Sequence, residues 1–217
     1  MRPLILASAS PRRRELLRSA GLRFRVVPSP HEEKPLPGEG AAAYARRAAR
    51  GKAEAALTLL GVKERRAALL AADTIVVLDG RILGKPSCGA EALNMLRALA
   101  GRVHTVVTAC CLYPWVGGPS APLEFALQSR VSLWDAPPEL LAAYAAGPEP
   151  LDKAGGYAAQ GAGAMLTRSV EGSWSNVVGL PVSETVEQLL ACGGSALRGA
   201  EAKGAAVVSA RVRQGGP

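Results

Sequence analysis

The sequence predicts an α/β fold built on a mixed sheet with flanking helices, and three observations carry that prediction. Short apolar runs typical of strands alternate with Ala- and Leu-rich segments typical of helices. Asp79-Gly80 lies between two apolar runs, which indicates a tight hairpin. A chain of 217 residues, 48% hydrophobic and 20% charged, is long enough to form a substantial core. Hairpins and crossovers together favour a mixed sheet over a purely parallel one.

The N-terminal segment predicts a strand, a tight loop and a helix. An apolar run begins at Leu4 and passes into two serines. Ser10 is a favourable N-cap, and Pro11 suits the first helical position, where no N–H partner is needed. Leu16 and Leu17 continue at helical spacing, and Gly21 is a natural end to the helix.

The remaining elements follow from apolar pattern and from glycine and proline positions. The expected strands cover residues 22–27, 67–72 with a continuation over 75–78, 81–83, 103–112, 123–134 and 165–170. The expected helices cover 41–60, 90–100, 137–146 and 181–191. Segments rich in proline, glycine or polar residues predict loops at 28–37, 113–122 and 171–180, and 149–161 is a glycine-rich polar segment.

These elements form one domain over residues 1–192. Residues 193–217 are rich in Gly and Ala and show no hydrophobic periodicity, so we expect a flexible, mildly basic tail or linker. No internal repeat is visible.

Composition narrows the class of protein. The net charge of +8 favours a polyanionic partner, although a solvated, Arg-rich surface explains the same number. The four cysteines have no C-x-x-C spacing, and Cys110 and Cys111 lie in an apolar run typical of buried thiols. This pattern favours a reducing compartment. No signal peptide or membrane span is recognisable, so we expect a cytoplasmic protein without a membrane partner.

The loop at the first helix has the chemistry of an anion site. Helix N-termini offer free N–H groups and partial positive charge. Ser8 and Ser10 add hydroxyls, and Arg12, Arg13 and Arg14 add forked donors that suit phosphate oxygens. The sequence contains no Walker loop. The alternative is an ordinary capped, basic helix with solvated arginines.

Carboxylates and lysines supply the remaining candidate groups. Asp73 follows two alanines at the end of an apolar strand, where it suits a base or metal ligand; the alternative is a turn-capping Asp. Glu33 lies in a loop, where a solvated acid is the ordinary finding. Carboxylates near bound phosphates are natural ligands of Mg²⁺. His31 and His104 are too far apart in sequence to suggest a catalytic pair, and His104 in a strand suits a structural hydrogen bond. Metal-assisted attack of water on phosphorus therefore fits better than covalent catalysis.

Six motifs in order resemble one family. They are Leu-Ala-Ser-Ala-Ser-Pro-Arg-Arg (6–13), Glu33 with Lys52, Ala-Asp-Thr (72–74) with Gly-Lys-Pro (84–86), Gly-Arg-Val-His-Thr-Val-Val-Thr (101–108), Glu-Pro-Leu-Asp-Lys-Ala-Gly-Gly-Tyr-Ala-Ala-Gln-Gly (149–161) and Asn-Val-Val-Gly-Leu-Pro (176–181). Together they resemble the Maf family of nucleoside triphosphate pyrophosphatases, over residues 4 to about 190. The Ser-Pro-Arg-Arg start and Gln160 resemble the branch acting on dTTP and UTP, which also occurs as the N-terminal domain of an acetylserotonin O-methyltransferase-like protein.

The resemblance implies a fold, a reaction and roles for residues. The fold would be elongated, similar to inosine triphosphate pyrophosphatases, with two lobes around a cleft. The reaction would cleave a nucleoside triphosphate between the α and β phosphates with Mg²⁺ or Mn²⁺. The implied groups for the triphosphate are Ser8, Ser10, Arg12, Arg13, Lys52 and Lys85. Glu33 and Asp73 would be metal ligand and general base, with Asp73 the better candidate for the base.

The resemblance also implies the remaining residues of the substrate site. Thr74, Asp152 and Lys153 complete the expected substrate site, and Gln160 would read the pyrimidine edge. Ala158-Ala159 stands where the family commonly has Gly-Ile, which leaves base preference less secure. The implied role includes removal of non-standard nucleotides, with a homodimer as a family expectation and no specific nucleic acid. The alternative is a non-catalytic nucleotide- or nucleic-acid-binding regulator of cell division.

Overall fold

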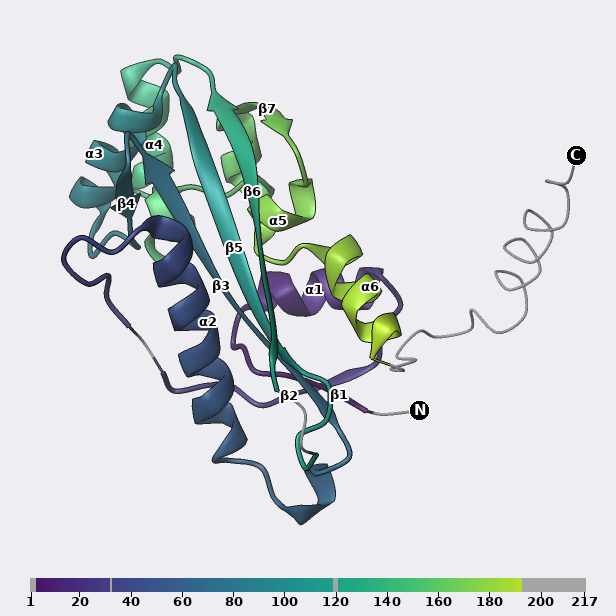
Figure 1. Cartoon of the computed structure of the whole chain (residues 1–217). Coiled ribbons are helices and arrows are strands. Elements are labelled where there is room, and N and C mark those ends of the chain that lie inside the picture. The colour runs from purple at the N-terminus through teal and green to yellow at the C-terminus, as the bar shows by residue number, and fades with distance from the viewer. Residues whose placement is uncertain (1–2, 32, 119–120, 193–217) are drawn as a thin grey trace, which may run out of the picture.

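A seven-stranded mixed sheet forms the centre of the molecule (Figure 1). The computed structural model describes residues 3–31, 33–118 and 121–192. The strand order is β2-β1-β3-β5-β6-β7, with β4 paired to β3. The strands are β1 (Leu4–Leu6), β2 (Phe24–Val26), β3 (Ala68–Leu78), β4 (Arg81–Leu83), β5 (Val103–Tyr113), β6 (Leu123–Leu133) and β7 (Thr167–Glu171). β1 pairs in parallel with β2 and β3, and the other pairs are antiparallel, so the predicted mixed sheet is confirmed.

The helices lie on both faces of this sheet. They are α1 (Pro11–Ser19), α2 (Ala41–Leu57), α3 (Gly89–Leu99), α4 (Pro138–Ala145), α5 (Trp174–Val178) and α6 (Val182–Ala191). Short 3₁₀ helices are η1 (Val62–Glu64), η2 (Glu149–Asp152), η3 (Ala154–Gly156) and η4 (Gly161–Leu166). None of the helices in the described part of the chain combines the length and hydropathy that crossing a bilayer requires.

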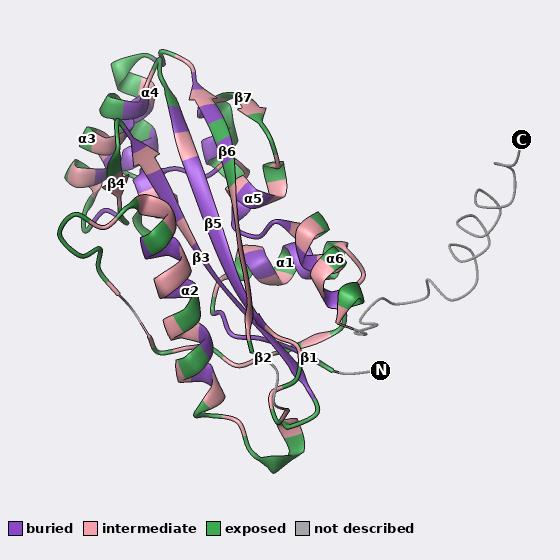
Figure 2. Ribbon diagram, viewed as in Figure 1, coloured by how far each residue is buried: buried purple, intermediate pink, exposed green. Residues whose placement is uncertain are grey.

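Side chains alternate along β3, so the core is divided between the two faces of the sheet. The core on one of these faces is divided again, which gives three clusters in all. Leu69, Ala71 and Ile75 face α2. On the opposite face, Leu70 and Ala72 pack with α1 and α6, whereas Val76 and Leu78 pack with α3 and α4. Figure 2 shows the buried residues concentrated along β3 and β5. The two clusters on this second face are the packed interiors of the predicted pair of lobes.

The neighbours of β3 leave a gap along one of its edges. β1 pairs with β3 only from Ala68 to Leu70, and β4 pairs with the same edge only from Val76 to Leu78. β5 covers the other edge without interruption from Leu69 to Val77. Residues 71–75 therefore lie between the ends of two partner strands, and Asp73 and Thr74 are at the centre of that gap.

Two local expectations were wrong. The strand expected over 67–72 and its continuation over 75–78 are not separated at Asp73 and Thr74: β3 runs unbroken through both residues to Leu78, because β5 pairs with it from Leu69 to Val77. The predicted loop over 171–180 contains α5, whose N-terminus is capped by the Ser173 hydroxyl accepting from the Asn176 N–H at 3.2 Å. The hairpin at Asp79-Gly80 and the buried thiols of Cys110 and Cys111 are confirmed. The expected tail over 193–217 lies outside the described residues and stays a prediction.

A buried histidine should make stability depend on pH. His104 is 3% exposed, and its Nε2 lies 2.6 Å from the Tyr157 hydroxyl, so the predicted structural hydrogen bond is confirmed. Burial lowers the pKa of His104 to about 4, whereas an unfolded histidine titrates near 6.5. Between these values the unfolded chain binds a proton that the folded chain does not. The free energy of unfolding should therefore fall as pH drops from 6.5 toward 4, by about 3 kcal/mol in total.

The variant His104→Gln checks this expectation, because an amide can still bond Tyr157 and does not titrate. Urea unfolding at pH 7.0, 5.5 and 4.5 should show a shallower loss of stability in the variant than in the wild type. Equal losses in the two proteins would contradict the assignment of this acid sensitivity to His104.

Candidate active site

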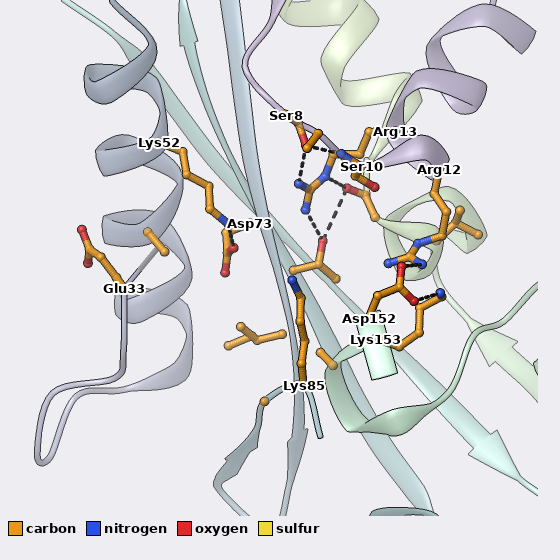
Figure 3. Close-up of a pocket in the computed structure, with 18 of the residues that line it drawn as sticks. Ser8, Ser10, Arg12, Arg13, Glu33, Lys52, Asp73, Lys85, Asp152 and Lys153 are labelled. Atoms are coloured by element: carbon orange, nitrogen blue, oxygen red, sulfur yellow. Dashed lines mark hydrogen bonds and ion pairs between the residues drawn. The ribbon is translucent and has the colours of Figure 1, made fainter. Parts of the chain in front are cut away.

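A cavity of about 920 Å³ opens at the gap in β3 (Figure 3). Six cationic side chains and three carboxylates line it. All twelve residues predicted for the site are among its lining: Ser8, Ser10, Arg12, Arg13, Glu33, Lys52, Asp73, Thr74, Lys85, Asp152, Lys153 and Gln160. Segments far apart in the sequence thus meet around one space. The excess of cations gives the cavity the charge that an oligophosphate requires.

Arg13 forms a fixed wall of the cavity. Its guanidinium donates from Nε to the Gly179 carbonyl at 2.7 Å, from Nη1 to Ser8 Oγ at 3.0 Å and from Nη2 to Thr74 Oγ1 at 3.0 Å. Burial lowers the pKa of Arg13, and the charge of Asp73 opposes that shift. Because its bonded partners are all uncharged oxygens, the positive charge of Arg13 remains available to an anion in the cavity.

A buried chain of polar groups holds the partners of Arg13. Thr74 Oγ1 and Thr108 Oγ1 lie 2.9 Å apart, and Thr108 donates to the Asn176 carbonyl at 2.8 Å. The Asn176 amide donates to Ser129 Oγ at 2.9 Å and to the Val106 carbonyl at 3.2 Å. Thr108 and Asn176 are fully buried. These contacts join β3, β5, β6 and α5 behind the cavity, and Thr74, one of the three acceptors of Arg13, belongs to them.

Asp73 and Thr74 reach the cavity from opposite faces of the sheet. Successive side chains of a strand alternate between faces. Thr74 faces α1 and Arg13, whereas Asp73 faces α2 and forms an ion pair with the Lys52 ammonium. Figure 3 shows Lys52 extending from α2 toward Asp73. The side chain of Asp73 is 13% exposed, so a carboxylate sits among cations with limited access to water.

Glu33 takes a different position from the one a shared metal site would require. Its carboxylate contacts His31 and Arg47, and Figure 3 shows it directed away from Asp73. The Tyr44 hydroxyl donates to the Glu33 carbonyl at 2.8 Å, which holds the loop against α2. Gly51 leaves the necessary space, because a Cβ there would overlap the side chains of His31 and Glu33.

Arg12, Asp152 and Lys153 form a group of charged side chains in the lining of the cavity. Arg12 pairs with Asp152 at 3.4 Å, and Asp152 also contacts the Lys153 ammonium. Burial raises the pKa of Asp152, but the hydrogen bond from Lys153 and the charges of Lys153, Arg12 and Lys85 lower it overall. Asp152 therefore neutralises part of the cationic mouth of the cavity.

Sequence reasoning missed several contributors to this site. The carbonyl of Gly179, the side chains of Thr108 and Asn176 and the cavity-lining Tyr157 received no role. Gly179 and Asn176 belong to a motif that was recognised, so their position in the motif was the available signal. Their contacts with Arg13 and Thr108 span more than 60 residues of sequence and depend on the fold.

Comparisons with known proteins show which family the chain belongs to. The model of the Maf-like protein family matches residues 3–192. A dTTP/UTP pyrophosphatase of Nitratidesulfovibrio vulgaris is 49% identical over 189 residues, which cover 87% of this chain and 87% of that protein. A dTTP/UTP pyrophosphatase of Oleidesulfovibrio alaskensis is 48% identical over 192 residues, which cover 86% and 84%. Among solved structures, a HAM1 protein of Coxiella burnetii covers 63% of this chain and 75% of its own, with 23% identity and a TM-score of 0.39.

Fold and site define an α/β protein with a cationic cleft that holds a carboxylate among lysines and arginines. The chain belongs to the Maf family. The family resemblance carried by the six sequence motifs is thereby confirmed.

Proposed function

We propose that this chain hydrolyses nucleoside triphosphates, dTTP and UTP foremost, to the nucleoside monophosphate and pyrophosphate. One observation carries the proposal: the Asp73 carboxylate lies beside Lys52 in a cavity lined by further cations and hydroxyls. Such an arrangement can hold phosphates and accept a proton in the same space. The names of the two relatives described above support the reaction and the pyrimidine substrates.

The triphosphate is bound by the basic groups of the cavity. Arg13 supplies a fixed charge, and the Ser8 and Ser10 hydroxyls and the start of α1 supply neutral donors. Arg12, Lys52, Lys85, Thr74 and Lys153 complete the polar lining. In phosphoryl transfer most of the rate comes from positioning and from neutralising charge on the phosphates. The free energy gained from these contacts therefore lowers the barrier to departure of pyrophosphate.

Asp73 acts as the general base. Its carboxylate takes a proton from a water molecule as the water oxygen bonds the α-phosphorus, and the bond from the α-phosphorus to the bridging oxygen breaks. Lys52 pairs with this carboxylate and holds it in place. Gln160 reads the base, and Asp152 adjusts the charge at the cavity mouth.

A divalent ion, Mg²⁺ or Mn²⁺, fits this donor set as a partner of substrate. Within residues 3–31, 33–118 and 121–192, no three His, Cys, Asp or Glu side chains gather as a metal site. Mg²⁺ is usually held by one or two carboxylates together with substrate phosphates and water. Asp73 meets that description, and Glu33 would have to exchange His31 and Arg47 for the ion. When bound, the ion supplies charge neutralisation at phosphate oxygens.

Several properties belong to the same proposal. They are removal of non-standard nucleotides, a cytoplasmic location and a homodimeric assembly. A non-catalytic regulator of cell division that binds nucleotides in the same cavity is the competing function.

The product of the wild-type reaction tests the proposal directly. Purified protein with dTTP or UTP and Mg²⁺ or Mn²⁺ should release pyrophosphate and the monophosphate in equal amounts, measured by anion-exchange chromatography. Orthophosphate with a diphosphate would contradict the site of cleavage. Tight nucleotide binding without turnover under every metal condition would favour the regulator instead.

A further inference from the structure

The segment that carries Gln160 is folded around a single carboxylate. Glu149, at the start of η2, accepts hydrogen bonds on Oε2 from the Tyr144 hydroxyl and from the Gly163 N–H, both at 2.8 Å. Tyr144 comes from α4 and is 5% exposed. The carboxylate of Glu149 has no cationic partner in the part of the chain that the structure describes, and both of these donors are neutral.

Tyr144 connects this carboxylate to the other end of the segment. Its hydroxyl accepts from the Ala158 N–H at 3.2 Å while donating to Glu149. Burial and the hydrogen bond to Glu149 raise the pKa of Tyr144, so the hydroxyl keeps the proton that it donates. The backbone is thus attached at residue 158 and again at residue 163 to one pair of side chains.

The packing of the segment leaves no space between it and these side chains. Gly161 has φ of +66°, and a Cβ there would overlap the Glu149 carboxylate. A Cβ on Gly163 would overlap the Ala158 carbonyl and the Tyr144 hydroxyl. Only glycine allows the chain to approach Glu149 and Tyr144 so closely, and the path of residues 158–163 is therefore determined by the pair.

The residues between the two attachment points face the nucleotide cavity. Ala158, Ala159 and Gln160 line it, whereas Glu149 and Tyr144 do not. The side chains of Ala158, Ala159 and Gln160 are neutral, in contrast to the cations proposed to hold phosphate. The nucleobase is the neutral part of the substrate. On the basis of the proposed function, we infer that Glu149 and Tyr144 are positioning residues that shape the base pocket and so determine base selectivity without contacting substrate.

The variant Tyr144→Phe tests the inference, because it keeps the packed ring and removes the hydroxyl. We expect the KM for UTP to rise about tenfold, with kcat within twofold of wild type, and the preference for UTP over ATP to fall. Inorganic tripolyphosphate, which has phosphates and no base, should inhibit wild type and variant with equal Ki. An equal rise in that Ki, or an unchanged UTP to ATP preference, would overturn the inference.

Three further variants separate positioning from general damage. Glu149→Gln retains an oxygen that can accept both hydrogen bonds and should keep the wild-type preference, whereas Glu149→Ala should lose it. Gly163→Ala should reproduce the Tyr144→Phe phenotype by displacing the segment.

Glu139→Ala, which changes an exposed acid on α4, is the matched control. Thermal unfolding of each variant identifies any that is not folded at the assay temperature. If wild type turns over no triphosphate, the proposed function fails; if wild type is active but these variants keep its selectivity, the inference alone fails.

Discussion

Replacing Asp73 with Asn should lower kcat for UTP about 100-fold to 10,000-fold, the range typical of losing a general base. The amide has nearly the shape of the carboxylate but cannot accept the proton of the attacking water. The side chain lies at the gap in β3 and pairs with Lys52, so the change also frees the ammonium to bind phosphate. Substrate affinity should therefore be retained or increased while turnover falls.

Asp79→Asn is the matched control for this prediction. It makes the same chemical change in the exposed hairpin turn after β3, where Asp79 pairs with Arg102 at 2.8 Å outside the cavity. Its kcat should stay within twofold of wild type. Circular dichroism should show both variants folded at the assay temperature. Turnover of Asp73→Asn near the wild-type value would exclude Asp73 as the base.

The dependence on metal distinguishes the two roles open to Asp73. If it is the base, the loss of kcat should persist at saturating Mn²⁺. If Asp73 is chiefly a metal ligand, higher Mn²⁺ should restore much of the turnover. The same titration on Glu33→Gln shows whether that carboxylate leaves Arg47 to bind metal.

The elements around the site were predictable where local chemistry decides them. Ser10-Pro11 starts α1, Asp79-Gly80 makes the hairpin, and the Ala-rich segment from 41 forms α2. Each signal lies within a few residues of the structure that it specifies. The motif positions also indicated which residues would gather, and all twelve line one cavity.

What sequence could not provide is the way in which distant segments shape that cavity. The site opens where β1 and β4 stop along β3, whereas the sequence suggested a break in β3 itself at Asp73 and Thr74, between residues 67–72 and the continuation over 75–78. The apolar pattern of a sequence indicates how long a strand is. How far that strand is paired along each edge depends on the lengths of the neighbouring strands. For the same reason the direction of the Glu33 carboxylate depends on Arg47 and on the space at Gly51, which a loop sequence does not reveal.

The second large effect should come from Arg13→Lys, a substitution that conserves charge. Arg13 satisfies three oxygens on three segments at once, at Ser8, Thr74 and Gly179. An ammonium at the end of a flexible stem cannot reproduce this planar fork. We expect kcat/KM for UTP to fall about 100-fold, similar to the loss of one charge-stabilising donor in other active sites. The free energy of unfolding should fall by about 2 kcal/mol, because buried acceptors lose donors.

Two comparisons decide whether the activity loss reflects the position of the charge. Arg18→Lys changes an exposed arginine near the end of the same helix and should alter neither quantity. Thr108→Val removes the buried hydroxyl behind Thr74 while leaving Arg13 in place, so its unfolding free energy should fall by about 1–2 kcal/mol. If Thr108→Val is as destabilised as Arg13→Lys but far more active, the loss in Arg13→Lys comes from the phosphate contact. Equal activity in the two variants would mean that Arg13 serves only the fold.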